Sequence, residues 1–320
     1  MLYLNNRMKI NKRIDQMNTY KVVDTLSQYD ELLKIHDLEK RKDYFRYEMM
    51  KPFKQMWNLI NVPLKAKQEN GYDVIMASKM LGYADVSDDK SIREGLSILK
   101  ETNAYTVAEN TIKNCIDKAN DAGLNINADE LKFGLYVSDP EKLKLQKGYT
   151  GFGGIPGFIT VNIYPNEYNL PKIPAVIAHE FNHNIRFSYF EWSHGDVTVG
   201  DYLVIEGLAE SFAKELYGTE QLGPWITSMD KDELEYSINV IDEVLEVKGF
   251  GEVSSYMFGD ELAIQEGYQP VGLPFCAGYA VGYKVVQSYM EKYDKTIYEA
   301  TLTSSDEIIN GCGLFTSRNN

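Results

Sequence analysis

Three residues whose side chains suit a metal centre stand within five positions of one another. They are His179, Glu180 and His183, in the pattern H-E-x-x-H. On a helix, residues four positions apart lie on one face, so both imidazoles can bind the same tetrahedral ion. The glutamate projects beside that ion, where its carboxylate can take a proton from a water molecule that the ion activates. The pattern therefore predicts a hydrolytic site with one Zn²⁺ ion.

The composition of the chain makes this short motif informative. Only four of the 320 residues are histidines, and two of them belong to the motif. A shuffled chain of this composition would contain the motif in roughly one case in a few hundred. The neighbours at 175–178 and Phe181 are apolar, so the motif helix should be buried. A helix whose histidines only pack or form hydrogen bonds is the alternative interpretation.

A catalytic zinc site needs a third protein ligand. The best candidate is Glu206, in the run Glu206-Gly207-Leu208-Ala209-Glu210 on the next predicted helix. Gly207 would let this helix approach the motif helix closely. Glu210 lies one turn later, where it can support a ligating imidazole through a hydrogen bond. Glu210 as the ligand, with Glu206 in support, and His194 in the intervening loop remain open alternatives.

Hydrolysis of an amide also requires a group that stabilises the developing oxyanion. Two tyrosines, Tyr279 and Tyr283, each follow a glycine on a helix that begins near Pro274. Either hydroxyl could donate a hydrogen bond to the oxyanion, and Tyr279, closer to the helix start, is preferred. The alternative is that both tyrosines pack in the core, where the glycines permit a close helix contact.

The elements that position these residues follow from periodicity and from glycine and proline. Predicted helices cover about 20–35, 39–60, 72–82, 90–101, 104–121, 174–191, 200–217, 231–247 and 274–293. Predicted strands cover 131–137 and 158–164, and the glycine-rich passage 148–157 between them is expected to be a flexible turn. An extended peptide could pair with an exposed edge of the strand at 158–164.

This pattern predicts an α+β fold, mostly helical, with a small sheet preceding the motif helix. We expect a helical N-terminal region over residues 1–125 and the catalytic domain over residues 126–320. The boundary is not marked by any linker composition, and the two parts could form one compact unit.

The charge of the chain narrows the classes of partner. The 33 basic and 47 acidic residues give a net charge of −14. Such a surface argues against nucleic acid or an anionic membrane as the main partner. No apolar stretch is long enough to span a bilayer or serve as a signal peptide, and the three cysteines lie far apart. We therefore expect a cytoplasmic protein that acts on a peptide or protein substrate.

The three motifs together resemble a known family. His179-Glu180-x-x-His183, the Glu206–Glu210 run and Gly278-Tyr279-x-x-Gly282-Tyr283 are similar to the DUF2268 family of predicted zinc-dependent proteases, the YjaZ-like bacterial proteins. More broadly, the chain resembles gluzincin metallopeptidases.

The resemblance covers about residues 130–300. It implies a zincin core of the thermolysin kind, with Glu206 as third ligand and a downstream tyrosine or histidine that assists the transition state. Two other functions remain open at this point: a zinc hydrolase acting on a non-peptide amide, and a stress-related regulatory protein that keeps its zinc without robust peptidase activity.

Overall fold

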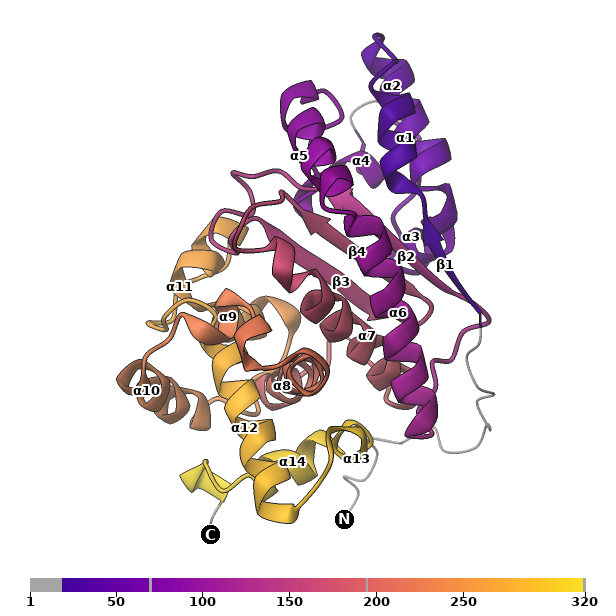
Figure 1. Ribbon diagram of the computed structural model, residues 1–320. Coiled ribbons are helices and arrows are strands. Elements are labelled where there is room, and N and C mark those ends of the chain that lie inside the picture. Colours follow the sequence, from indigo (N-terminus) through magenta and orange to yellow (C-terminus); the bar gives the residue numbers. More distant parts are fainter. Residues whose placement is uncertain (1–18, 69–70, 194, 319–320) are drawn as a thin grey trace. The chain divides into compact units, whose positions relative to one another are not determined.

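The computed structural model describes residues 19–68, 71–193 and 195–318 (Figure 1). They form two compact units. Residues 19–118 and 127–180 make up a unit with a β-sheet, here called the sheet unit. Residues 119–126 and 181–318 make up the helical unit. The predicted α+β class, mostly helical with one small sheet, is confirmed.

The sheet has four strands in the order β1-β2-β4-β3. They are β1 (Tyr20–Val23), β2 (Leu131–Val137), β4 (Phe158–Ile163) and β3 (Tyr149–Ile155). The first three run parallel, and β3 is antiparallel to β4. All six residues of β4 are buried, as expected for an inner strand covered on both faces.

The prediction of a helix beginning at residue 20 is wrong for its first turn. Tyr20 to Val23 form β1, and helix α1 (Thr25–Leu32) begins only after Asp24. The Asp24 carboxylate accepts a hydrogen bond from the backbone N–H of Ser27, which caps the helix. Val22 and Val23 fit a helical spacing equally well, but β-branched residues favour a strand when a neighbouring strand is available.

Two predictions about the chain between residues 148 and 164 are also wrong. Residues 149–155 are strand β3 rather than a flexible turn. Strand β4 is paired on both sides, so it offers no exposed edge to a peptide. The edge strand on this side of the sheet is β3. Glycine is unfavourable in strands by propensity, and its presence here marks a close approach of another backbone.

Among the described residues, six further helices or helical turns of the sheet unit, and most of a seventh, lie between α1 and β2 along the chain. They are α2 (Leu38–Tyr44), a π-helical turn (Phe45–Met49), a 3₁₀ turn (Lys51–Phe53), α3 (Lys54–Leu59), α4 (Val74–Met80), α5 (Asp89–Glu101) and α6 (Ala104–Asp121), whose last turn belongs to the helical unit. The single helix predicted over 39–60 is thus broken around Pro52, which has no N–H to continue it.

Aromatic rings fill the core of the sheet unit. Tyr83 and Tyr136 have ring centroids 4.9 Å apart, and Tyr29 and Phe53 each meet Tyr136 edge-on. The Tyr29 hydroxyl accepts a hydrogen bond from the Val137 backbone N–H at 3.2 Å, which ties α1 to β2. These contacts pack α1 and the turn at Phe53 onto strand β2.

The helical unit contains most of the remaining chain. A 3₁₀ turn (Leu170–Lys172) of the sheet unit precedes α7 (Ile173–Tyr189). The following helices all belong to the helical unit: α8 (Val199–Tyr217), α9 (Pro224–Thr227), α10 (Lys231–Asp242), α11 (Phe250–Glu266), α12 (Ala277–Tyr293), α13 (Ile297–Thr301) and α14 (Ser305–Gly311), with 3₁₀ turns at Thr219–Gln221 and Thr316–Arg318. Helix α7 is shared, because the division between the units falls between Glu180 and Phe181. Helices α9, α11, α13 and α14 were not predicted.

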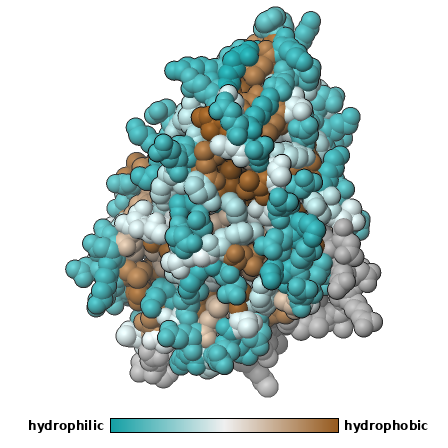
Figure 2. Space-filling view, in the orientation of Figure 1, coloured by the Kyte–Doolittle hydropathy of each residue, from teal (hydrophilic) through white to brown (hydrophobic). Residues whose placement is uncertain are grey.

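Figure 2 shows that hydrophilic residues cover most of the face in view, with smaller apolar areas between them. No helix among the described residues combines the length and the apolar character that crossing a membrane requires.

Candidate metal centre

Helices α7 and α8 bring three of the predicted ligands together. One ligand atom each from His179, His183 and Glu206 lies within 4.8 Å of the other two. His179 and His183 are one turn apart on the continuous helix α7, so helix geometry fixes their spacing. His183 and Glu206 belong to the helical unit, and His183 Nε2 lies 3.5 Å from Glu206 Oε2.

The donor set fits a zinc ion. All three residues are buried, with 5–6% of their surface exposed. Two imidazoles and one carboxylate are the protein ligands of one common catalytic zinc type, in which a fourth position takes water or substrate. Burying a carboxylate is costly unless a cation or hydrogen bonds compensate it, and a divalent ion would compensate Glu206. The alternative ligand His194 lies outside the described residues.

Glu180 is buried against strand β3 within the sheet unit. A Cβ atom added to Gly151 would lie closer than 3.0 Å to the Glu180 carboxylate. A Cβ on Gly153 would overlap the Glu180 backbone carbonyl. Side chains two positions apart on a strand point to the same face, so these two glycines together make room for Glu180. This role was not predicted from the sequence, although the alternating Gly151-Phe152-Gly153 pattern was its signal.

Gly207 has a different neighbour from the one predicted. A Cβ atom at Gly207 would overlap the backbone carbonyl of Gly282 on α12, and a Cβ at Gly282 would overlap that of Leu203 on α8. The glycine therefore permits close packing of α8 on α12 rather than on the motif helix. The two helices run in the same direction, and Gln287 Nε2 donates to Ser211 Oγ at 2.9 Å further along. This contact fixes Glu206 relative to the tyrosine helix.

Glu210 has a hydrogen-bond partner that was not predicted from the sequence. The indole Nε1 of Trp225, on α9, donates a hydrogen bond to Glu210 Oε1. Glu210 is only 2% exposed, so this bond compensates part of the cost of burying its carboxylate. Glu210 is not a member of the three-residue ligand group. Its place one turn after Glu206 fits the supporting role that the sequence predicts.

The two tyrosines lie on one side of α12, four positions apart. Tyr279 is on the first turn of the helix and is partly buried. Burial, and secondarily the negative charge of Glu210, raise the pKa of Tyr283 to about 12. Lys214 Nζ lies 5.8 Å from the Tyr283 ring centroid. The Tyr283 hydroxyl therefore keeps its proton throughout the neutral range and can act as a hydrogen-bond donor.

Cys276 precedes α12 in a left-handed backbone conformation, with φ of 55°. Burial raises the pKa of its thiol well above the usual value, and the charges of Glu206 and Glu210 raise it further. The thiol therefore remains protonated. It is close enough to both carboxylates for their negative charge to disfavour the thiolate.

A kink in α11 holds the segment that leads into α12. At Gly259 the helix adopts φ 68° and ψ 170°, a conformation that essentially only glycine occupies. The Asp260 carboxylate accepts hydrogen bonds from the backbone N–H groups of Val271, Gly272 and Leu273. The N–H of Cys276 donates to the Phe258 carbonyl at 2.7 Å. These bonds position the start of the helix that carries Tyr279.

Replacing Asp260 by Ala is expected to lower the free energy of unfolding by about 2 kcal/mol, because three backbone N–H groups lose a charged acceptor. Urea denaturation measures the change. Asp260→Asn keeps the Oδ1 position that accepts from all three groups, so it should lose clearly less. An unchanged urea midpoint in Asp260→Ala would show that the backbone contacts alone hold this segment.

The second half of the motif helix is fixed by polar bonds inside the helical unit. Asn182 Nδ2 donates to Thr301 Oγ1 at 3.1 Å. Arg186, which is 2% exposed, donates to the carbonyls of Thr301 and Thr303 at 2.8 and 2.6 Å, and its guanidinium lies 3.5 Å from the Phe190 ring centroid. These bonds, which hold α7 to the end of α13, were not predicted from the sequence.

Comparison with known proteins identifies the class. A model of the DUF2268 family, described as a predicted Zn-dependent protease, matches residues 104–310. The chain belongs to this family, as the resemblance in its motifs implied.

Two relatives come from Bacillus subtilis (strain 168). The uncharacterized protein YjfC is 60% identical over 293 residues, which cover 92% of this chain and 98% of the relative. The uncharacterized protein YjaZ is 28% identical over 127 residues, or 39% of this chain and 45% of the relative. No solved structure matches this chain.

Proposed function

We propose that this protein is a zinc-dependent peptidase with a zincin active-site core of the thermolysin kind. The observation that carries the proposal is the buried group of His179, His183 and Glu206, whose ligand atoms lie within 4.8 Å of one another. Structural zinc sites have four protein ligands, whereas catalytic sites have three and leave one position for water. Three ligands are found together among the described residues, which favours catalysis over a purely structural ion.

A bound Zn²⁺ would polarise the substrate carbonyl and lower the pKa of a water molecule. Glu180 lies inside the ligand motif and is 5% exposed. Its carboxylate accepts a proton from the attacking water and then returns this proton to the leaving amine. Because Gly151 and Gly153 have no side chains, strand β3 can lie directly against Glu180. This close packing restricts the position of the carboxylate.

Two further parts of the chain complete the proposed site. The hydroxyl of Tyr279, or that of Tyr283, donates a hydrogen bond to the oxyanion that forms at the carbonyl. The edge strand β3 lies against Glu180, so an extended substrate can align beside this strand. A peptide bound in this way would have its scissile bond near the proposed general base.

Metal content and chelation test the proposal. The purified protein is expected to bind about one equivalent of zinc per chain and to cleave members of a peptide library, and a chelator should stop cleavage. His183→Ala should lose zinc, because one of three ligands is gone. His36→Ala is the matched control, since His36 is exposed and lies on another segment.

Parallel variants separate the two glutamates. Glu206→Gln should weaken zinc binding at least tenfold more than Glu210→Gln does, if Glu206 is the ligand and Glu210 its support. Full zinc occupancy in His183→Ala would overturn the site assignment. Stable zinc binding by the wild type without cleavage of any peptide would overturn the peptidase proposal and favour a regulatory or non-peptide role.

A further inference from the structure

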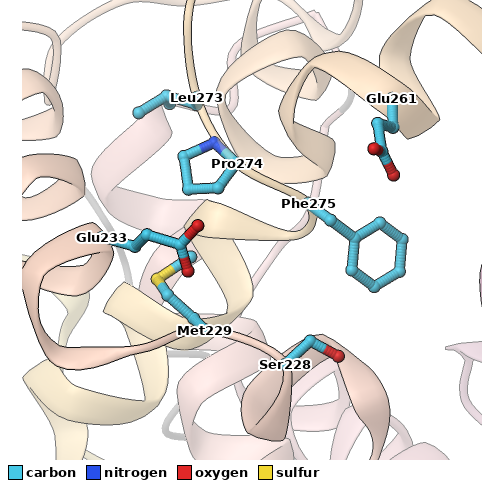
Figure 3. A pocket seen from close by; sticks show the side chains of 7 residues that line it. All are labelled: Ser228, Met229, Glu233, Glu261, Leu273, Pro274 and Phe275. Carbon is cyan, nitrogen blue, oxygen red and sulfur yellow. The ribbon is translucent and has the colours of Figure 1, made fainter.

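A cavity of about 380 Å³ lies within the helical unit, outside the group of metal ligands. Its lining consists of Ser228, Met229, Glu233, Glu261, Leu273, Pro274 and Phe275 (Figure 3). The volume is at the lower end of the range of small-ligand pockets, large enough for a single side chain. None of the residues that the proposed mechanism uses lines it.

The lining combines apolar walls with two carboxylates. Met229, Leu273, Pro274 and Phe275 offer apolar surface. Glu233, on α10, and Glu261, on α11, are exposed to solvent, and neither forms an ion pair within the part of the chain that the structure describes. In the view of Figure 3 their carboxylates lie on either side of the Pro274–Phe275 segment. No basic residue lines the cavity, so its charge is negative.

Both walls of the cavity are joined to the candidate metal centre through short pieces of chain. Ser228 lies three positions after Trp225, which is hydrogen-bonded to Glu210. Three residues span at most roughly 11 Å. On the other wall, Phe275 stands two positions before the start of α12, and Gly282 of this helix packs against Gly207, the neighbour of Glu206. Both walls are therefore tied to α8 and α12, the helices that carry Glu206 and Tyr279.

We infer that this cavity binds a basic side chain of the substrate, preferably arginine, within a few residues of the bond that is cut. An arginine has an aliphatic stem for the apolar walls and a planar guanidinium that pairs with carboxylates and stacks on an aromatic ring such as Phe275. This inference rests on the proposed peptidase function and names the class of substrate for it.

Peptide cleavage gives the first test. A peptide library digested by the wild type should show arginine or lysine enriched at one position close to the cut. For the best peptide, replacing that arginine by citrulline, which keeps the shape and removes the charge, should raise KM about ten- to hundredfold and leave kcat little changed. Absence of any positional preference for a basic residue would overturn the inference.

Paired variants locate the preference. Glu233→Gln and Glu261→Gln should each reduce the arginine-over-citrulline preference, and the double variant should remove it. Gln at 233 can still accept from the Asp230 N–H in the helix cap, so α10 should remain folded. Glu235→Gln and Glu252→Gln are matched controls on the same two helices and should behave as wild type. A preference that survives in the double variant contradicts the assignment.

A binding measurement separates this inference from the proposed function. Nα-acetyl-arginine methylamide and its citrulline analogue are titrated against the wild type and the double variant, with NMR shifts as the readout. If the wild type binds the arginine probe, the double variant does not, and no peptide is cleaved, the peptidase function is refuted. The binding role of the cavity then stands. If peptides are cleaved but the arginine and citrulline probes bind equally or not at all, the binding role of the cavity is refuted. The peptidase function then stands.

Discussion

The Glu180→Gln variant is expected to bind zinc as tightly as the wild type and to lose about two to four orders of magnitude in kcat. Glutamine has the same shape as glutamate but cannot accept a proton from water, and general acid–base groups contribute effects of this size. Zinc content by metal analysis and steady-state cleavage of a library-derived peptide measure the two properties separately. Glu180 is not one of the three grouped ligands, which is why binding should survive.

The control for this variant is Glu215→Gln, a change at an exposed glutamate near the end of α8. It should retain both zinc and activity. Equal cleavage by Glu180→Gln and the wild type would remove Glu180 from the mechanism. Loss of zinc in Glu180→Gln would instead show that the carboxylate helps to hold the ion, and the ligand set would need revision.

The second large effect is expected at Gly153. An added Cβ there would overlap the backbone carbonyl of Glu180, and backbone atoms cannot rotate away as a side chain can. Gly153→Ala should therefore separate β3 from the motif helix, lower the free energy of unfolding by about 1–3 kcal/mol and reduce kcat about a hundredfold. Urea denaturation and peptide cleavage measure these changes, with zinc content showing whether the ligands remain in place.

Gly251→Ala is the matched control, because nothing lies within 4 Å of a Cβ added at this position near the start of α11. Alanine is about 1 kcal/mol better than glycine inside a helix, so this variant should be as stable as the wild type or more stable. Unchanged stability and activity in Gly153→Ala would mean that β3 does not fix the position of Glu180.

The sequence predicted the parts of the site that depend on local spacing. The helix that carries His179 and His183 was predicted from its apolar residues. The predicted end of this helix near residue 190 and the predicted start of the next helix near residue 200 are close to the observed bounds. The grouping of Glu206 with these histidines was predicted as well, because one loop and about two helical turns leave few other arrangements.

The parts that depend on distant contacts were not predictable in the same way. Trp225 is joined to Glu210 by the packing of α9, and no pattern in its own segment indicates this. Asp260 meets the loop at 271–273 beside the kink at Gly259 in α11, and no local pattern indicates this contact. The strand at Tyr20–Val23 and the strand at 149–155 were misread because partner strands, rather than local propensity, decide their conformation.

The parallel pairing of β1 with β2 has a consequence for the synthesis of the chain. Tyr20 pairs with Leu131, so the first strand leaves the ribosome long before its partner has been made. At about 5–20 residues per second, the wait is roughly 6–22 s. During this time the apolar faces of the N-terminal helices have no sheet to cover them. Nascent chains paused before residue 131 should therefore be the ones that chaperones capture most readily.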